Sequence, residues 1–363
     1  MTEEKRHTAD RKVLVAMSGG VDSTVAAFLL KEQGYDIAGV TMNLRLKGVG
    51  DESARCCGPD VLEDARRVCE RLGVAHHVVD YARELEERVV SRFVREYRRG
   101  RTPNPCVDCN RHLKFGSLLG KAVAMGFDFL ATGHYARIDR AGGGCLLRRP
   151  RDRRKDQTYF LYSIPRDALR RIIFPLAPFT KEEVRRIAAR AGLPLAEKKE
   201  SQDICFVTQK NYGAFISQRI DGIRPGPITD LAGKKVGEHR GIVFYTVGQR
   251  SGLRVSAGRP LYVVSIDPAG NRIVVGEKED VLARGLIAGD INALVEEWPA
   301  VAYGKLRYRK KEEPCRVSVE GRKLRVMFEE KQEAITPGQS VVLYDGDVVL
   351  GGGVIEEVIG GVR

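Results

Sequence analysis

The sequence has no long hydrophobic run. None of its apolar stretches approaches the roughly 18 residues that a membrane-spanning helix needs. Residues 1–12 are polar and lack the apolar segment of a secretory signal. We therefore expect a cytoplasmic protein with no membrane partner.

The chain also lacks several common site patterns. It contains no Walker A motif (G-x-x-x-x-G-K-[ST]), no tandem repeat and no low-complexity segment. Its eight cysteines do not suggest a disulfide framework in a cytosolic chain of this length. Cys106 and Cys109 form the one C-x-x-C pair, and because a cysteine-only zinc site needs two such pairs, a closed structural zinc site is disfavoured.

The composition is that of a globular protein with an excess of basic residues. The 363 residues suffice for two or three domains, and the 43% hydrophobic and 30% charged content is ordinary. Lys and Arg number 61 against 48 Asp and Glu, a net charge of +13 that favours a polyanionic partner. The basic residues are densest at residues 92–101 and 148–155. One such patch fits a solvated face equally well, but two favour nucleic acid.

Residues 13–23 are the most informative stretch. Residues 13–17 are apolar without a polar face, as in a strand covered on both sides. Gly19 and Gly20 allow a tight turn and a close approach of a ligand to the backbone. Residues 21–30 then have helical spacing. The first N–H groups of that helix, beside Ser18 and Ser23, predict an anion-binding site.

Strand and helix patterns alternate through the first part of the chain. Short apolar strands are expected at residues 36–42, 76–79 and 127–132, and helices within residues 55–73 and at 84–98, 112–125, 155–161 and 181–192. This alternation predicts an α/β domain with a doubly wound parallel sheet. Met42 ends its strand and is expected near the point where the strand order reverses, where ligands bind.

The cysteines divide by context. Pro103 and Pro105 predict a rigid, irregular loop that presents Cys106 and Cys109 just before a helix, whose N-terminus should lower the pKa of the Cys109 thiol. Cys205 stands in a polar segment; a lone cysteine is more often a core residue than a catalytic one, but Cys205 suits catalysis if it faces Cys109 across a cleft. The remaining five are expected to be core, surface or packing residues: Cys56, Cys57, Cys69, Cys145 and Cys315.

From residue 208 onward the composition of the sequence changes. Gly, Pro and Val become more frequent, and strands replace most helices. Hairpins are expected at residues 261–275, 317–328 and 340–355, each centred on a Gly-containing turn. The end of the chain should therefore form a small β-barrel or sandwich.

Together these motifs resemble the tRNA-uridine 2-sulfurtransferase (2-thiouridylase) family. Ser18-Gly19-Gly20-Val21-Asp22-Ser23 is similar to the pyrophosphate-binding loop of the N-type ATP pyrophosphatases. Further similar segments follow in the family's order at residues 104–115, 131–135, 155–162, 200–206, 246–252, 307–308 and 336–340. The resemblance implies a PP-loop, HUP-like catalytic domain over residues 1–207, a small middle domain over 208–283 and a C-terminal β-barrel over 284–363.

The resemblance also implies an activity and a set of site residues. The activity is ATP-dependent 2-thiolation of the wobble uridine in tRNAs for lysine, glutamate and glutamine. ATP would be held, with Mg²⁺, by Ala16, Met17, Ser18, Gly19, Gly20, Val21, Asp22, Ser23, Met42 and Gly133. The tRNA would meet Asn104, Pro105 and Cys106 at the target base, and elsewhere His134, Lys155, Asp156, Gln157, Arg307, Tyr308 and Gln339.

Two sulfur chemistries fit the resemblance. In one, Cys205 carries a persulfide from a sulfur donor, either a cysteine desulfurase or a relay protein, and Cys109 releases the sulfur and ends in a disulfide with Cys205. In the other, Cys106, Cys109 and Cys205 ligate a [4Fe-4S] cluster. Some members carry an acidic residue at the position of Cys106. Asp22 would position either Mg²⁺ or the loop.

Three other functions deserve comparison. Another N-type pyrophosphatase, such as an amidotransferase-like or argininosuccinate-synthase-like ligase, needs neither Cys109 with Cys205 nor a basic stripe. A non-catalytic tRNA-binding module would not need the intact loop at residues 18–23. A cytidine thiolase is chemically closest, but the C-terminal barrel and Lys155-Asp156-Gln157 favour the uridine enzyme.

Overall fold

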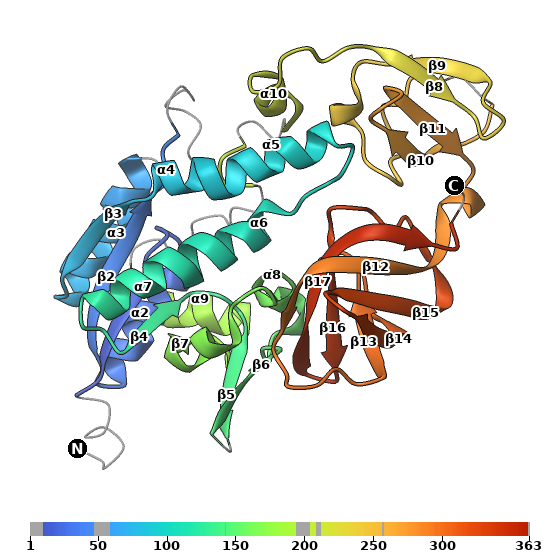
Figure 1. Ribbon diagram of the computed structural model, residues 1–363. Coiled ribbons are helices and arrows are strands. Elements are labelled where there is room, and N and C mark those ends of the chain that lie inside the picture. Colours follow the sequence, from blue (N-terminus) through green and yellow to red (C-terminus); the bar gives the residue numbers. More distant parts are fainter. Residues whose placement is uncertain are drawn as a thin grey trace. The chain divides into compact units, whose positions relative to one another are not determined.

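The protein packs as two units. In the computed structural model, the described residues are 10–46, 59–141, 143–193, 204–207, 212–255 and 258–361. Unit 1 comprises Met1–Val89, Cys106–Lys210 and Asp347–Val349, and unit 2 comprises Val90–Pro105, Asn211–Gly346 and Leu350–Arg363. Figure 1 shows the helices and strands of both, and each unit is described by itself below.

Unit 1 is built on a five-stranded parallel sheet. Its strands are β1 (Lys12–Ala16), β2 (Asp36–Asn43), β3 (His76–Asp80), β4 (Phe129–Thr132) and β7 (Ile172–Ile173). They lie in the order β3-β2-β1-β4-β7, with every neighbouring pair parallel. The order reverses between β1 and β4, so this is the doubly wound sheet that the alternation predicted. Its topological switch point lies at the carboxyl ends of β1 and β4.

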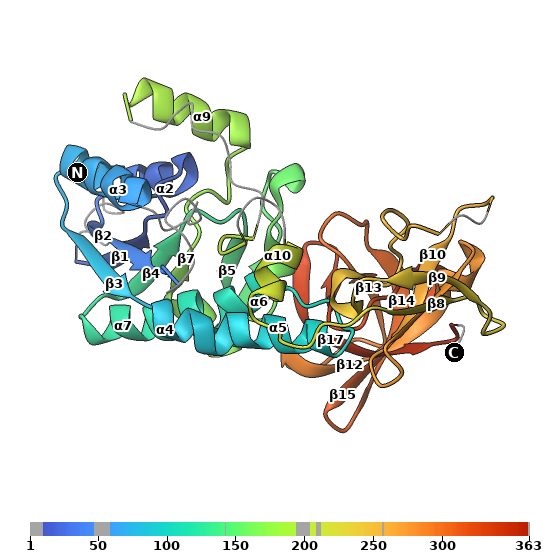
Figure 2. The same cartoon turned by 90° about the horizontal axis from the view of Figure 1, so that it is seen from above.

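Helices cover both faces of this sheet. Figure 2 shows α2 (Val21–Glu32), α3 (Pro59–Leu72) and α9 (Lys181–Arg190) on one side, and α4 (Ala82–Leu85) and α7 (Leu119–Ala124) on the other. A β-strand covered on both sides needs apolar residues at successive positions, and Val13, Leu14 and Val15 are all 0% exposed. The continuous apolar run of β1 is therefore explained.

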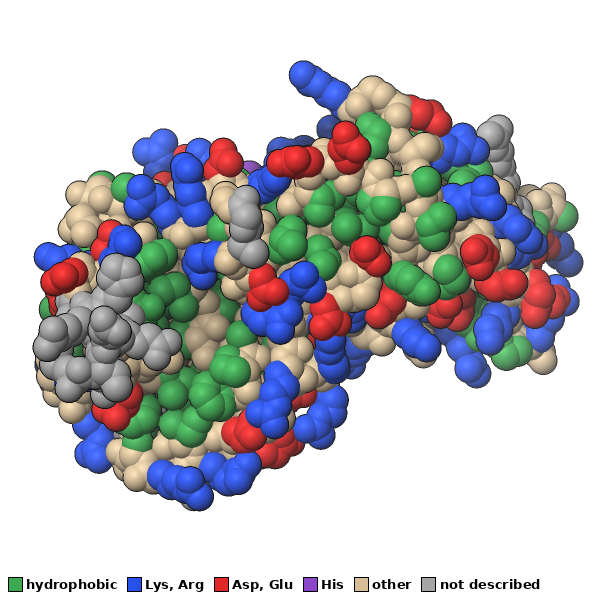
Figure 3. Space-filling view, turned by 90° about the horizontal axis from the view of Figure 1, so that it is seen from below, with side chains coloured by type: hydrophobic (Ala, Val, Ile, Leu, Met, Phe, Trp, Pro, Cys, Tyr) green, Lys and Arg blue, Asp and Glu red, His purple; other side chains and the backbone are tan. Residues whose placement is uncertain are grey.

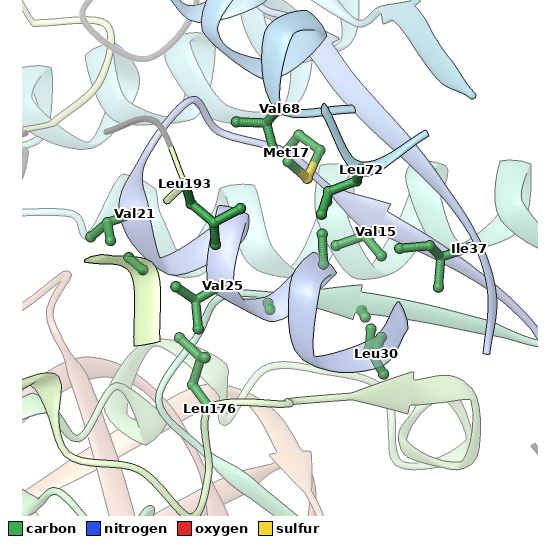
Figure 4. Close-up of a cluster of buried hydrophobic side chains, with 14 of the residues drawn as sticks. Val15, Met17, Val21, Val25, Leu30, Ile37, Val68, Leu72, Leu176 and Leu193 are labelled. Carbon is green, nitrogen blue, oxygen red and sulfur yellow. The ribbon is translucent and has the colours of Figure 1, made fainter. Parts of the chain in front are cut away.

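The main core of unit 1 lies between the sheet and helices α2, α3 and α9. Val15 of β1 and Val25 of α2 belong to one buried cluster with Leu72 and Leu193 (Figure 4). Cys69 is part of this core, as expected, and burial raises the pKa of its thiol to about 11. A thiol in that environment stays protonated and inert at neutral pH.

The helix after the two prolines begins earlier than the sequence indicated. The expectation of an irregular loop up to Asn110 is wrong, because α6 (Pro105–Asp108) already starts at Pro105. It leads directly into the π-helical segment η3 (Cys109–Leu118) and then α7. Proline fits the first helical position, where its missing N–H would have no partner within the helix. Cys106 and Cys109 consequently lie in the helix and not before it.

The remaining elements of unit 1 are short. They are the hairpin of β5 (Arg137–Ala141) and β6 (Gly144–Arg148), the 3₁₀ turns η4 (Arg153–Lys155) and η5 (Arg166–Arg171), and α8 (Thr158–Leu161). The helix expected from Lys155 is thus only a 3₁₀ turn followed by a single α-turn. α9 ends at Arg190, and Gly192, with a φ of +59° in the left-handed region, closes the helix as expected.

Unit 2 contains a small mixed sheet with two helices. The sheet runs β10-β11-β8-β9, from β8 (Gly226–Thr229), β9 (Lys235–His239), β10 (Tyr262–Asp267) and β11 (Arg272–Gly276). α5 (Ser91–Arg98) follows the π-helical η2 (Glu86–Val90) and packs on α10 (Tyr212–Ser217). The Tyr97 ring stacks on Tyr212 at 5.3 Å, and Phe93 meets Phe215 edge-on at 6.3 Å.

The rest of unit 2 is a closed antiparallel barrel. Its strands are β12 (Leu282–Ala293), β13 (Val301–Lys305), β14 (Glu313–Glu320), β15 (Lys323–Glu333), β16 (Ser340–Asp345) and β17 (Val348–Ile359). β12 pairs with both β15 and β17, which closes the ring and decides between the predicted barrel and sandwich. Leu324, Val326 and Phe328 alternate inward along β15. Burial raises the pKa of the Cys315 thiol to about 12, as suits a structural cysteine.

The arginines of one predicted basic patch are paired with acidic side chains. In the patch at residues 148–155, Arg148 pairs with Asp139, Arg149 with Asp156, Arg151 with Glu183, Arg153 with Asp347 and Arg154 with Glu182. Figure 3 likewise shows acidic and basic side chains interspersed on the face that it presents. Within the described part of the chain, no helix is long and apolar enough to cross a bilayer.

Candidate active site

The predicted anion loop lies at the switch point of the unit 1 sheet. It connects β1 to α2, and Gly19 adopts a φ of +61° at the turn. Gly20 is the N-cap of α2 and has no side chain with which to cap the first N–H groups of the helix. The Ser23 hydroxyl bridges the loop, accepting from the Ser18 N–H at 3.2 Å and donating to the Gly20 carbonyl at 3.0 Å. A glycine turn of this kind at a helix N-terminus is suited to phosphate oxygens.

Gly133 closes the loop from the neighbouring strand. It follows β4, and a Cβ on it would lie 2.7 Å from two backbone atoms, Asp22 C and Ser23 N. That spacing is shorter than real Cβ contacts, so only glycine allows the end of β4 to approach the first turn of α2 this closely. The loop and the end of β4 are therefore packed backbone to backbone.

The first turn of α2 contains one partner of an ion pair that was not predicted from the sequence. Lys181 Nζ lies 2.7 Å and 2.8 Å from the two carboxylate oxygens of Asp22, and the Tyr135 hydroxyl donates to Asp22 Oδ1 at 3.0 Å. Lys181 begins α9 just after the N-cap Thr180, which forms a capping box with Glu183. A cation at a first helical position opposes the helix dipole, and that local conflict was the available sequence clue.

His134 is locked beside the loop. Its Nδ1 lies 2.7 Å from Thr132 Oγ1 and its Nε2 lies 3.4 Å from Lys114 Nζ, while its ring packs against Phe115 and Phe174. Burial, and then the charge of Lys114, hold the pKa of His134 well below its usual value of 6.5. Because an ammonium can only donate, Nε2 accepts, and Nδ1–H donates to Thr132. The ring is therefore neutral at neutral pH.

Replacing His134 by glutamine should flatten the pH dependence of stability. The unfolded chain binds a proton at this imidazole near pH 6.5 whereas the folded protein does not, so the wild type loses stability as the pH falls below about 6.5. From about pH 7.5 to pH 5.5 the variant should lose about 1 kcal/mol less than the wild type. Urea titrations at each pH give these free energies of unfolding. Parallel curves for the two proteins would contradict this account of His134.

In unit 2, the barrel holds the segment that precedes the cysteine pair. Thr102 N–H donates to the Pro337 carbonyl at 2.9 Å, and Gln339 Nε2 donates to the Thr102 carbonyl at 2.8 Å and to that of Pro103 at 3.4 Å. Gly338 adopts a φ of +91°, and a Cβ there would lie 2.9 Å from Thr102 N. The backbone at residues 102–103 is thus fixed immediately before Asn104 and Pro105.

Comparison with known proteins identifies the family. Family models match the chain in three consecutive parts: a tRNA methyl transferase HUP domain at residues 11–209, a tRNA methyl transferase PRC-barrel domain at 213–277 and an aminomethyltransferase beta-barrel domain at 283–355. The tRNA-specific 2-thiouridylase MnmA 1 of Syntrophus aciditrophicus is 58% identical over 351 residues, covering 96% of this chain and 94% of that protein. The chain belongs to the tRNA-specific 2-thiouridylase family. The MnmA of Carboxydothermus hydrogenoformans is 48% identical over 358 residues, covering 96% of this chain and 98% of that protein.

The fold expected of the 2-thiouridylase family is confirmed. The HUP-type parallel sheet with its glycine loop and the C-terminal barrel are both present. A HUP-type sheet with such a loop is a fold that supports ATP binding. Met42 is the last residue but one of β2, one strand away from the switch point, and is half-buried. Ala16 ends β1 and is half-buried, whereas the side chain of Met17 is 3% exposed and belongs to the core.

The family's cysteines lie in different settings. Cys106 is exposed, Cys109 is 9% exposed at the start of η3, and Cys205 is half-buried in the described segment 204–207. The structure brings no three His, Cys, Asp or Glu side chains of the described residues into a group that could hold a metal ion, and Cys106, Cys109 and Cys205 are all among those residues. They therefore do not form a ready iron–sulfur site. Cys56 and Cys57 lie outside the described residues.

The residues expected to meet tRNA in this family differ in accessibility. Asp156 is 5% exposed and pairs with Arg149, and its carboxylate accepts from the N–H and the hydroxyl of Thr158, so it stabilises the local fold. Gln157 accepts from the Tyr135 N–H at 2.9 Å and thus braces the strand end next to His134. Lys155 is half-buried at the end of η4.

Two more of these residues belong to unit 2. The Arg307 guanidinium donates to the Ala334 carbonyl and the Thr336 hydroxyl, both at 2.8 Å. Tyr308 is half-buried, with Lys305 Nζ 5.8 Å from its ring centre. Arg307 is therefore already used to join the middle and barrel parts of unit 2, since it also reaches the Val247 carbonyl at 3.5 Å.

Proposed function

We propose that this protein is a tRNA-specific 2-thiouridylase that uses ATP to place sulfur at C2 of the wobble uridine of tRNAs for lysine, glutamate and glutamine. The observation that carries the proposal is the anion loop of residues 18–23 at the switch point of the sheet. Near full-length similarity to proteins named for this activity supports it. The reaction would take place in the cytoplasm.

The loop suits activation of the uridine oxygen. The C2 oxygen is a poor leaving group, so it must first attack the α-phosphate of ATP and become part of AMP, with release of pyrophosphate. The N–H groups at the start of α2, with Ser18 and Ser23, would hold the departing β- and γ-phosphates. Asp22 supplies one carboxylate in this turn, which fits a Mg²⁺ bound mainly by phosphate oxygens and water. That ion would neutralise developing charge.

Sulfur transfer would fall to Cys205 and Cys109. A donor protein, either a cysteine desulfurase or a relay protein, would leave a persulfide on Cys205. The Cys109 thiolate would attack Cys205 Sγ, forming the disulfide and expelling hydrosulfide, which adds to C2 while AMP leaves. In a direct variant the terminal persulfide sulfur attacks C2 first. A cluster ligated by Cys106, Cys109 and Cys205 would require these residues to move together, since they form no metal site here.

The tRNA contacts follow from the family positions. Asn104, Pro105 and Cys106 would lie at the target base, and Cys106 is exposed at the start of the helix. His134, Lys155, Gln157, Tyr308 and Gln339 are each at least partly accessible and would meet other parts of the tRNA. Asp156 and Arg307 are joined to other parts of the protein by an ion pair and by hydrogen bonds of the guanidinium, respectively.

Gln339→Ala should weaken tRNA thiolation without affecting ATP binding. The variant removes the donor that fixes the Thr102 carbonyl, so the backbone before Asn104 becomes looser. We expect the free energy of unfolding to fall by about 1 kcal/mol and kcat/KM for tRNA to fall several-fold. Gln218→Ala, at an exposed position of unit 2, is the matched control. Equal tRNA kinetics in the two variants would rule out this positioning role.

An anaerobic reconstitution tests the function. Purified protein is incubated with Mg²⁺-ATP, a cysteine desulfurase, cysteine and unmodified glutamate tRNA, and 2-thiouridine, pyrophosphate and iron are measured in the same sample. Thiouridine formed by iron-free protein supports the proposal with the Cys205 persulfide. Thiouridine that requires iron supports the cluster. Pyrophosphate release without thiouridine under any sulfur source would mean that another acceptor is adenylated, and the proposal would fail.

A further inference from the structure

A buried ammonium group meets the anion loop. The Lys181 side chain is 6% exposed, whereas that of its partner Asp22 is 29% exposed. The pair is bidentate, at 2.7 Å and 2.8 Å, and the Tyr135 ring lies under the same ammonium with its centre 5.9 Å from Nζ. Removing one partner of a buried pair is costly because it leaves a desolvated charge. Lys181 must therefore be paired with an anion in every state of the site.

The backbone of Lys181 is fixed but its side chain has length to spare. Its N–H donates to the buried Asp152 carboxylate at 2.9 Å, and the capping box of Thr180 and Glu183 sets the first turn of α9. α9 packs directly on α2, the helix that carries the loop. Four methylene groups join this anchored backbone to the ammonium, so Nζ can move between neighbouring oxygens while α9 stays in place.

We propose that Lys181 moves its ammonium from Asp22 to the β- and γ-phosphates when ATP enters the loop, and so releases the Asp22 carboxylate for Mg²⁺. This inference rests on the proposed function. Asp22 lies in the first turn of α2, the turn whose N–H groups would hold the phosphates. Its carboxylate therefore pairs with the Lys181 ammonium when phosphate is absent. The exchange leaves every charge paired. Lysine acts here as a mobile point charge for phosphate, and Mg²⁺ prefers carboxylate oxygen.

The exchange makes opposite predictions for the two partners. In metal-free buffer, Lys181→Met loses the cation and should bind inorganic pyrophosphate roughly 10- to 100-fold more weakly than the wild type, the value of a charged hydrogen bond. Asp22→Asn removes the competing anion and should bind pyrophosphate more tightly than the wild type. A merely structural ion pair predicts loss of binding in both variants, because each leaves an unpaired charge in the loop.

Calorimetric titrations with pyrophosphate, ATP and AMP carry the test. Lys181→Met should weaken pyrophosphate and ATP binding but leave AMP unchanged, and Lys181→Arg should retain most of the pyrophosphate affinity. The double variant Lys181→Met with Asp22→Asn carries no unpaired charge and guards against a folding defect, and it should bind pyrophosphate more weakly than Asp22→Asn alone. Lys121→Met, at an exposed lysine of α7, is the matched control.

The outcomes separate the two proposals. If the wild type binds neither ATP nor pyrophosphate, the proposed function fails and the exchange fails with it. If the wild type binds both ligands, and Lys181→Met matches Lys121→Met, only the exchange is overturned. Weaker pyrophosphate binding by Asp22→Asn would also overturn it. Titration of the nucleotide-free protein with Mg²⁺ alone adds a last check, since Lys181→Met should expose Asp22 and bind the ion more tightly than the wild type.

Discussion

Cys205→Ser is expected to abolish tRNA thiolation while ATP cleavage continues. A hydroxyl cannot carry sulfane sulfur, so 2-thiouridine formation should fall by at least about 10³-fold, the scale of losing an essential nucleophile. Pyrophosphate release with unmodified tRNA should persist, because the loop at residues 18–23 does not use this side chain. Mass spectrometry of the tRNA and a coupled pyrophosphate assay on one sample separate the two steps.

Cys109→Ser tests the second half of the same chemistry. Cys205 should still accept sulfur from the desulfurase, visible as one added sulfur atom on that residue, but release should stall and thiolation should fall by a similar factor. Cys145→Ser, at the half-buried cysteine of β6, provides the matched control and should retain full activity. Thiolation by Cys109→Ser at the wild-type rate would remove Cys109 from the mechanism.

Gly133→Ala has the second largest expected effect. The new methyl group would lie 2.7 Å from the backbone at Asp22 and Ser23, so the end of β4 or the first turn of α2 must shift. A displacement of about 1 Å at a binding loop can cost about 10²-fold, and we expect ATP affinity to fall by that factor. The strain should also lower the free energy of unfolding by about 1–3 kcal/mol. Calorimetric ATP titration and urea unfolding measure the two effects.

Gly120→Ala is the control for that substitution. Gly120 lies in α7, and a Cβ there would meet nothing within 4 Å. Alanine in an open helix position should leave ATP affinity unchanged and stabilise the protein by about 0.5–1 kcal/mol. ATP binding as tight in Gly133→Ala as in Gly120→Ala would show that β4 and the loop tolerate separation.

The parts of the site that could be predicted from the sequence are local. A buried strand, two glycines and a helix start are consecutive in residues 13–23, so the anion loop needed no knowledge of distant contacts. The alternation of strands and helices likewise predicted the sheet. The start of the helix at Pro105 was missed because proline both breaks helices and begins them, and its position in the helix decides which.

The parts that could not be predicted depend on distant partners. Lys181 and Asp22 are separated by 159 positions, and the sequence around either residue does not predict their contact. The arginines of residues 148–155 look like a nucleic-acid patch in the sequence, yet Arg151 and Arg153 each meet a carboxylate from a distant segment. A count of charges gives the net value, whereas the fold decides which charges remain to attract a partner.

The segment that precedes the cysteine pair has a consequence for exchanging parts between relatives. Residues 90–105 pack with the barrel and middle strands, and their backbone bonds to Pro337 and Gln339 belong to unit 2. A recombinant hybrid joined once near residue 210 would set this segment of one parent against the barrel of another. A transplantable cassette consists instead of three discontinuous stretches, residues 90–105, 211–346 and 350–363. The segments that must be exchanged together therefore begin within a helix, at residue 90, and not at a domain boundary in the linear sequence.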